Sequence, residues 1–321
     1  MEPIDRESAM SIRLGYLLPT REVVMRGQPE AGPLLDLAER AETIGFDSVW
    51  VGDSLLARPR HEPLTLLAGI AGRTKKVELG TAVLLPTLRN PVIMAHQVAT
   101  LDQISQGRVI LGVGIAADVS AIRAEFAAAG VPFEKRVGRM MEGLRLCKAL
   151  WSGAPVDWDG RWPVQQGVLA PRPHRPGGPP IWGGGSAPAA RVRTGRHFDG
   201  WFPTGPDAAG WAEQWAGVKD SAKEAGRNPD DLVGAVYLTL AINDDAAKAQ
   251  QQVDTFMEEY YGASAKVLAK HQATYAGGEA GCSDWLRGYA DTGATHMVLR
   301  FAGEHEKHMD VIAKIRASLG W

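Results

Sequence analysis

The stretch VELGTAVLLPTLRNPVIMAHQVATLDQISQGRVILGVG, residues 77–114, carries the pattern that decides the fold. Residues 77–83 are mostly apolar and β-branched, which predicts a buried strand. The Asn-Pro pair at 90–91 begins a helix, because asparagine suits an N-cap and proline loses no hydrogen bond in the first turn. Gly107 ends that helix, and residues 109–113 form a second apolar strand. Strand, helix and strand in this order predict parallel pairing in a sheet that is covered on both faces.

The same alternation continues on both sides of this stretch. Besides the two strands above, apolar segments predict strands at residues 12–18, 47–51, 180–183, 199–202, 232–242 and 295–301. Eight strands that alternate with helices predict an α/β fold, a (β/α)8 TIM barrel, with an open doubly wound sheet as the alternative.

Two segments interrupt this alternation. Residues 152–179, after the fourth helix of the barrel, are rich in proline and glycine. We interpret them as an excursion, such as a short hairpin, across the outside of the barrel, with a domain boundary as the alternative. Residues 244–273, after the seventh strand, are predicted helical and are too long for a simple connection, which indicates a second excursion. We therefore expect a flexible leader over residues 1–10 and a single barrel domain over residues 11–321.

The composition is that of an enzyme-sized globular protein. The chain has 321 residues, 45% of them hydrophobic and 22% charged, with a formal net charge of −2 at pH 7. This charge offers no electrostatic basis for binding nucleic acid or an anionic membrane. The first residues lack the apolar core of a secretory signal, and no apolar run is long enough to span a membrane, so we expect a cytoplasmic protein.

Motifs for metal or nucleotide chemistry are missing from the sequence. Cys147 and Cys282 fit no metal-ligand spacing, and we expect buried free thiols rather than a disulfide. The histidines and carboxylates form no recognisable metal motif, so we expect no metal ion. A serine-hydrolase elbow and a Walker loop are also missing, which leaves little support for hydrolysis.

In a (β/α)8 barrel the active site lies at the carboxyl ends of the strands, so residues just after each strand are candidates. Gly183, Gly184, Gly185 and Ser186 lead directly into a helix. Backbone N–H groups of a glycine-rich turn, together with a helix N-terminus, suit a phosphate. The alternative is a plain strand–helix turn in which Ser186 is the N-cap.

Charged and aromatic side chains at other strand ends are further candidates. Asp53, after the second strand, either takes part in the chemistry or caps a helix. Arg58 and Arg60 either bind an anion or are solvated loop residues. Arg300, at the end of the eighth strand, is either a substrate or phosphate ligand or part of a structural ion pair. Tyr16 either contacts a ligand or packs in the core.

Three segments together resemble the bacterial-luciferase-like superfamily of flavin and deazaflavin (coenzyme F420) oxidoreductases. They are GTAVLLPTLRNPVIMAHQVATLDQISQGRVILGVG at 80–114, PIWGGGS at 180–186 and THMVLRF at 295–301. The resemblance implies that the cofactor's phosphate lies near residues 184–186 and that its ring packs against residues 81–83. It also implies a cis peptide bond between Ala82 and Val83. The implied contacts of the ring are Thr81, Ala82, Val83, Gly114, Ile115 and Ala116.

The chain also departs from part of this superfamily. The deazaflavin enzymes that act on sugar phosphates and methylene-pterins carry a histidine where this chain has Ser54 and an acid where it has Ala117, although Asp118 is adjacent. These departures count against a deazaflavin dehydrogenase. Our first hypothesis is therefore a monooxygenase that uses reduced FMN and oxygen on a small organic substrate. Its candidate catalytic residues are Asp53, Ser54 and Arg300.

Two alternatives remain. One is an oxidoreductase that transfers hydride with coenzyme F420, in which Arg58 and Arg60 hold the anionic tail. The other is a flavin-binding relative that has lost catalysis. For the FMN-dependent reaction, the resemblance implies that a separate flavin reductase can supply the cofactor, and it further implies a homodimer.

Overall fold

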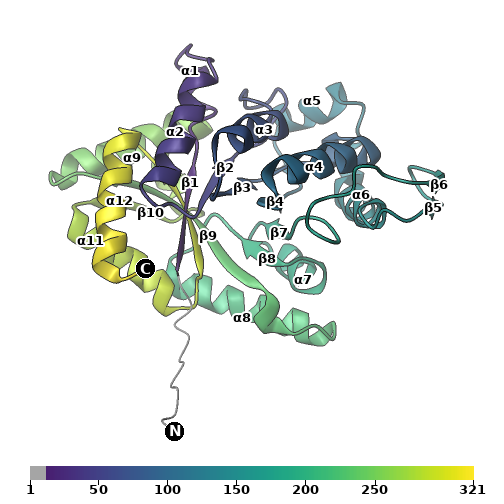
Figure 1. Ribbon diagram of the computed structural model, residues 1–321. Coiled ribbons are helices and arrows are strands. Elements are labelled where there is room, and N and C mark those ends of the chain that lie inside the picture. Colours follow the sequence, from purple (N-terminus) through teal and green to yellow (C-terminus); the bar gives the residue numbers. More distant parts are fainter. Residues whose placement is uncertain (1–11) are drawn as a thin grey trace, which may run out of the picture.

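Residues 12–321, which the computed structural model describes, contain eight parallel strands that close into a barrel (Figure 1). Neighbouring strands pair in the order β11, β1, β2, β3, β4, β7, β8 and β9, and pairing of β9 with β11 closes the circle. The predicted barrel and its eight strands are confirmed, and the predicted leader, residues 1–10, lies outside the described residues. The strands are β1 Arg13–Leu17, β2 Ser48–Val51, β3 Glu78–Thr81, β4 Val109–Val113, β7 Ile181–Gly184, β8 Gly200–Phe202, β9 Val233–Ile242 and β11 His296–Phe301.

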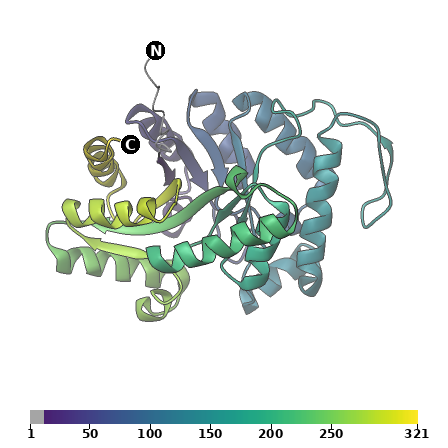
Figure 2. The ribbon, with the colours of Figure 1, turned by 90° about the horizontal axis from the view of Figure 1, so that it is seen from below.

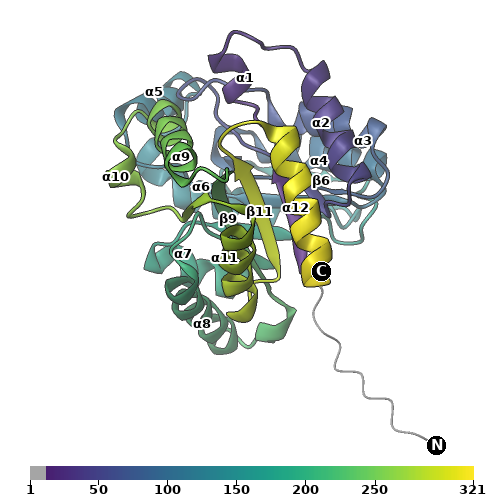
Figure 3. The same ribbon diagram turned by 90° about the vertical axis from the view of Figure 1, so that its left-hand side faces the viewer.

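Helices surround the strands, and Figure 3 shows α11 and α12 beside β9 and β11. The helix of the opening stretch begins as predicted, because Asn90 Oδ1 accepts a hydrogen bond from the backbone N–H of Val92 at 2.9 Å. Of the helices in the described part of the chain, none is long and apolar enough to cross a membrane. Their bounds are α1 Glu22–Met25, α2 Gly32–Thr43, α3 Pro63–Arg73, α4 Pro91–Ser105, α5 Ser120–Ala128, α6 Arg136–Leu150, α7 Pro188–His197, α8 Ala208–Glu224, α11 Glu279–Asp291 and α12 His305–Leu319.

The first excursion is the predicted hairpin. Strands β5 (Val156–Trp158) and β6 (Val164–Gly167) pair antiparallel, and the segment projects from the side of the barrel (Figure 2).

Both cysteines are free and buried, as expected, and Cys147 Sγ donates a hydrogen bond to the Pro91 carbonyl at 3.3 Å.

The second excursion differs from the prediction in its detail. The helix expected over residues 244–273 ends early, because Gly262 adopts a left-handed φ of 69° after α9 (Ala246–Tyr261). A short helix, α10 (Ala265–Leu268), follows. The chain then returns as a strand, β10 (Thr274–Gly277), which pairs in parallel with the last part of β9. This strand was not predicted. The excursion as a whole brings Tyr260 and Tyr261 over the barrel mouth.

Large aromatic rings fill the interior of the barrel. The ring centroid of Trp50 lies 5.3 Å from that of Trp182 and 4.8 Å from that of Phe202. The indole N–H of Trp50 donates to Ser48 Oγ at 2.7 Å, and this hydroxyl is also hydrogen-bonded to His296 Nε2 at 2.7 Å. Burial lowers the pKa of His296 to about 3, so its imidazole is neutral inside the barrel.

We expect Gly80→Ala to lower the free energy of unfolding by about 1–3 kcal/mol, the usual cost of overpacking. A Cβ at this position would lie 2.1 Å from Trp50 Cε3, and the neighbouring rings leave the fully buried indole little room to move. The matched control is Gly72→Ala in α3, where nothing lies within 4 Å of the added Cβ. The control should be neutral or raise stability by up to about 1 kcal/mol. Urea denaturation measures both changes, and equal stability of the Gly80→Ala variant and the wild-type chain would contradict this packing.

Candidate active site

A cavity of about 210 Å³ opens at the carboxyl ends of the barrel strands. The loops after β2, β3, β4, β7 and β8 contribute to its wall, together with Tyr237 of β9 and residues of α5 and α9. This is where a (β/α)8 barrel places its chemistry. The lining residues are Asp53, Ser54, Arg58, Arg60, Ala82, Val83, Leu85, Ala116, Ala117, Ile122, Glu125, Gly184, Gly185, Phe202, Thr204, Tyr237, Tyr260 and Tyr261.

The cavity wall at β3 follows the expectation from the sequence. The peptide bond between Ala82 and Val83 is cis, and both residues line the cavity. Glycines lie against the Val83 side chain: a Cβ on Gly114 would be 2.7 Å from Val83 Cγ2, and one on Gly184 would be 3.2 Å from Val83 Cγ1. Any other residue at these two positions would push into Val83. The wall beside the cis bond is therefore shaped by a glycine directly after β4 and a glycine at the end of β7.

The glycine turn after β7 is also suited to an anionic group. Gly185 adopts a φ of 97°, a conformation that favours glycine, and lies on the cavity wall with Gly184. The N-cap of α7 is Ala187, not Ser186, and no side chain caps the helix. The alternative in which Ser186 is the N-cap is therefore wrong. Pro188 has no N–H, and the Ala190 N–H donates to the Ala187 carbonyl at 2.8 Å, so the N–H of Ala189 is the one that the first turn of α7 leaves for a phosphate.

Several predicted contacts lie behind the wall rather than on it. Thr81 is fully buried, and its Oγ1 donates to the Gly112 carbonyl at 2.8 Å. Tyr16 is also fully buried, where its hydroxyl is hydrogen-bonded to His305 Nδ1 at 2.8 Å. The cavity wall does not include these two, nor the remaining residues predicted to contact the cofactor, which are Gly114, Ile115, Gly183 and Ser186.

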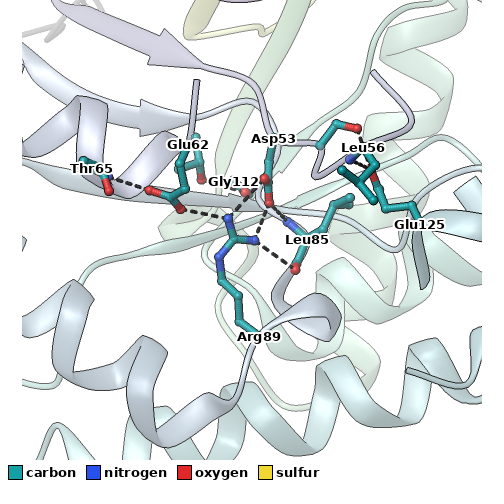
Figure 4. A network of polar contacts seen from close by, with 10 residues as sticks. Asp53, Leu56, Glu62, Thr65, Leu85, Arg89, Gly112 and Glu125 are labelled. Atoms are coloured by element: carbon teal, nitrogen blue, oxygen red, sulfur yellow. Dashed lines mark hydrogen bonds and ion pairs between the residues drawn. The ribbon is translucent and has the colours of Figure 1, made fainter. Parts of the chain in front are cut away.

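Asp53 reaches the cavity but is held in an ion-pair network (Figure 4). Its Oδ2 accepts from Arg89 Nη1 at 2.6 Å and from the Leu85 backbone N–H at 2.8 Å, and its Oδ1 accepts from Arg89 Nη2 at 3.1 Å. Arg89 Nη2 also donates to Glu62 Oε1 at 2.9 Å. Asp53 therefore neither caps a helix nor offers a free carboxylate oxygen. It fixes the loop after β3 to the loop after β2.

Ser54 is hydrogen-bonded to an acid, Glu125, that was not among the predicted site residues. Its hydroxyl donates to Glu125 Oε2 at 2.9 Å, and the same oxygen accepts from the backbone N–H groups of Leu56 and Ala57 at 2.6 and 2.8 Å (Figure 4). Glu125 is 1% exposed, and its other oxygen, Oε1, is buried without a hydrogen-bond partner. The sequence does contain a feature that points to Glu125: it is an acid on the apolar face of α5, between the buried residues Ile122 and Phe126.

Arg300 does not reach the cavity, although it lies near the barrel mouth. It is fully buried, and its Nε and Nη2 donate to Thr239 Oγ1 at 3.0 and 2.8 Å. Its Nη1 donates to the hydroxyl of Tyr261 at 2.9 Å, and the guanidinium carbon lies 4.7 Å from the ring centroid of Tyr260. Arg300 thus contacts the back of two tyrosines that line the cavity, and it takes no part in an ion pair with the carboxylates of residues 12–321.

No group of three or more histidines, cysteines and carboxylates is arranged to hold a metal ion within the described chain.

Known proteins share this architecture. A model of the luciferase-like monooxygenase family matches residues 12–320. The F420-dependent glucose-6-phosphate dehydrogenase of Amycolatopsis mediterranei is 28% identical over 321 aligned residues, which cover 88% of this chain and 94% of that protein. A monooxygenase from Streptomyces bottropensis superposes with a TM-score of 0.81 and 21% identity over 97% of this chain and all 100% of the other. An F420-dependent secondary alcohol dehydrogenase, solved with an F420-acetone adduct, gives a TM-score of 0.81 and 20% identity over 95% and 98% of the two chains.

The closed parallel barrel with a cavity at its strand ends has the architecture of a (β/α)8 enzyme, and the match to the family model makes it a luciferase-like oxidoreductase. The chain belongs to the luciferase-like monooxygenase family, since the family model matches nearly all of its length. Enzymes of this family use FMN or coenzyme F420 as the redox cofactor.

We expect Asp53→Ala to lower the free energy of unfolding by about 3 kcal/mol, because the change leaves Arg89 without its bidentate partner in a buried place. The Asp53 and Arg89 side chains are 4% and 18% exposed. The matched control is Asp36→Ala, which removes a partner of Arg73 that is 69% exposed and should cost less than about 1 kcal/mol. Urea denaturation of both variants measures the difference. Similar, small losses in the two variants would contradict a structural role of the Asp53–Arg89 pair.

Proposed function

We propose that the protein is an oxidoreductase that transfers a hydride between coenzyme F420 and a small organic substrate. The support comes from the relative that matches across 88% of the chain at 28% identity and is named as F420-dependent. It favours the F420 alternative over the FMN-dependent monooxygenase that the sequence alone suggested first. The observation on which the chemistry rests is that Glu125, a residue of the cavity wall, has a buried Oε1 without a hydrogen-bond partner.

The residues present fit such a cofactor. Ala82 and Val83 would support the ring, and Gly184 and Gly185, with the uncapped start of α7, would hold the phosphate. The glycines matter here because a Cβ on Gly184 would already be 3.2 Å from both Val83 Cγ1 and the Val113 carbonyl oxygen. When bound, coenzyme F420 supplies a carrier for two electrons in the form of a hydride.

The proton of the reaction needs a separate acceptor or donor. Among residues 12–321, the carboxylates on the cavity wall are those of Asp53 and Glu125. Both oxygens of Asp53 are engaged with Arg89, whereas Glu125 has one engaged oxygen and one without a partner. We therefore assign Glu125 Oε1 to the proton that leaves or enters a substrate hydroxyl, with Ser54 orienting the carboxylate. Because Ser54 and Ala117 depart from the pattern of the sugar-phosphate enzymes, we do not extend the relative's substrate to this chain.

The cofactor is tested by fluorescence titration of the purified protein with coenzyme F420, FMN and reduced FMN. We expect F420 to bind at least about tenfold more tightly than FMN in either state, a difference of about 1.4 kcal/mol. Tighter binding of reduced FMN would overturn the proposal and restore the monooxygenase hypothesis. Binding of F420 without turnover on any of a panel of alcohols and carbonyl compounds would instead indicate a non-catalytic relative.

For the proton step we expect Glu125→Gln to reduce kcat by about 100-fold or more, on an alcohol that supports F420 reduction. Glutamine can keep the three hydrogen bonds to the loop at residues 54–57 but cannot take a proton. F420 affinity should therefore change by less than about twofold. Glu134→Gln, at an acid whose side chain is 72% exposed, is the matched control and should behave as wild type. Full activity of the Glu125→Gln enzyme would show that Glu125 only supports the loop.

A further inference from the structure

The loop after β2 places two arginines on the cavity wall without carboxylate partners. Arg58 and Arg60 line the cavity, and neither forms an ion pair within residues 12–321. Arg89, which also comes from a loop at this mouth, is by contrast neutralised by Asp53 and Glu62. A guanidinium that faces a cavity without a counter-ion is suited to an anionic ligand.

Aromatic rings hold the two guanidinium groups in place. The guanidinium carbon of Arg58 lies 5.1 Å from the ring centroid of Tyr261, and that of Arg60 lies 5.7 Å from the centroid of Tyr260. Arg60 Nε also donates to the Arg58 carbonyl at 3.2 Å. Cation–π contacts of this kind orient a guanidinium without cancelling its charge. The two arginines are therefore fixed as a pair rather than free in solvent.

A glycine makes room for this pair. A Cβ on Gly52, directly after β2, would lie 2.1 Å from Arg60 Nη1. The guanidinium of Arg60 thus lies against the backbone at the end of β2, close to the cavity floor, and any larger residue at position 52 would displace it.

The surroundings add positive charge. Arg300 lies behind Tyr260 and Tyr261, with its guanidinium carbon 4.7 and 5.3 Å from their ring centroids. The carboxylate of Glu22 interacts electrostatically with both Arg60 and Arg300, and burial raises the pKa of this carboxyl group. One acid of this kind cannot neutralise three guanidinium groups, so this side of the cavity is cationic.

We propose that Arg58 and Arg60 form a subsite for an anionic group, a carboxylate or a phosphate, that is carried by the substrate. The substrate is then a small organic anion whose reacting carbon lies between this subsite and the Ala82–Val83 wall. The cofactor has its own anion site at Gly184 and Gly185, at the end of β7, which β3 and β4 separate from β2, and we therefore assign the arginine pair to the substrate. This placement of the cofactor rests on the proposed function, whereas the anion site itself does not.

The experiment is calorimetric titration of the intact protein with inorganic phosphate and with malonate, at constant ionic strength. We expect the arginine pair to bind one anion per chain, in addition to any phosphate at Gly184 and Gly185, and Arg58→Gln or Arg60→Gln to weaken binding at the pair about tenfold or more. Arg60→Lys keeps the charge but loses the planar fork of the guanidinium. Its anion affinity should therefore lie between those of the wild-type protein and the Arg60→Gln variant. Arg287→Gln, on the outer helix α11, is the matched control and should bind as wild type. Gly52→Ala should lose affinity as Arg60→Gln does, although it keeps every arginine.

A second titration distinguishes an anionic group of the substrate from the anionic tail of the cofactor. It repeats the measurement with the protein saturated with coenzyme F420. Unchanged anion affinity at the arginine pair supports a substrate subsite, and loss of anion binding at this pair would overturn it by giving the arginines to the cofactor's own tail. No anion binding to the protein alone, or equal binding by all variants, would also overturn the proposal. If F420 fails to bind while the anion still does, the proposed function fails and the arginine site stands.

Discussion

Packing of indole rings inside the barrel is the constraint on which the rest of the structure depends. Trp50 and Trp182 lie side by side in the interior, and glycines on three strands leave the space that they need. A Cβ would lie 2.6 Å from Trp50 Nε1 at Gly15, 2.1 Å from Trp50 Cε3 at Gly80, and 2.7 Å from Trp182 Cδ1 at Gly200. With the interior filled in this way, the strand ends are fixed relative to one another, and the loops that form the cavity start from fixed points.

At the mouth of the barrel, the pairing of charges separates structural groups from reactive ones. Asp53, Arg89 and Glu62 neutralise one another and connect two loops. Glu125 keeps one oxygen without a partner, and Arg58 and Arg60 keep their charges unpaired over tyrosine rings. A buried or half-buried group without a partner costs free energy unless a ligand satisfies it. The groups without partners therefore indicate which side chains would exchange a proton with a ligand and which would bind its charge.

The sequence predicted the strands well because each is a short apolar run between turn residues, and the order of strand and helix then determines a barrel. It predicted the cis bond at Ala82–Val83 through family resemblance, since alanine and valine alone give no sign of it. It failed where contacts join distant segments. Glu125 is 71 residues from Ser54 in the chain, and only the fold brings them together. Arg300 ends a strand at the mouth, yet tyrosines from the excursion after β9 separate it from the cavity. The strand β10 was missed because its pairing with β9 has no local signal.

The most direct test of the proposed cofactor site is a crystal structure of the protein with coenzyme F420. We expect the ring against Ala82 and Val83, the cofactor's phosphate beside Gly185 at the start of α7, and open space between the ring and the side chains of Glu125, Arg58 and Arg60. A complex in which the cofactor's phosphate or tail occupies the arginine pair, or in which the ring lies away from the Ala82–Val83 wall, would contradict it.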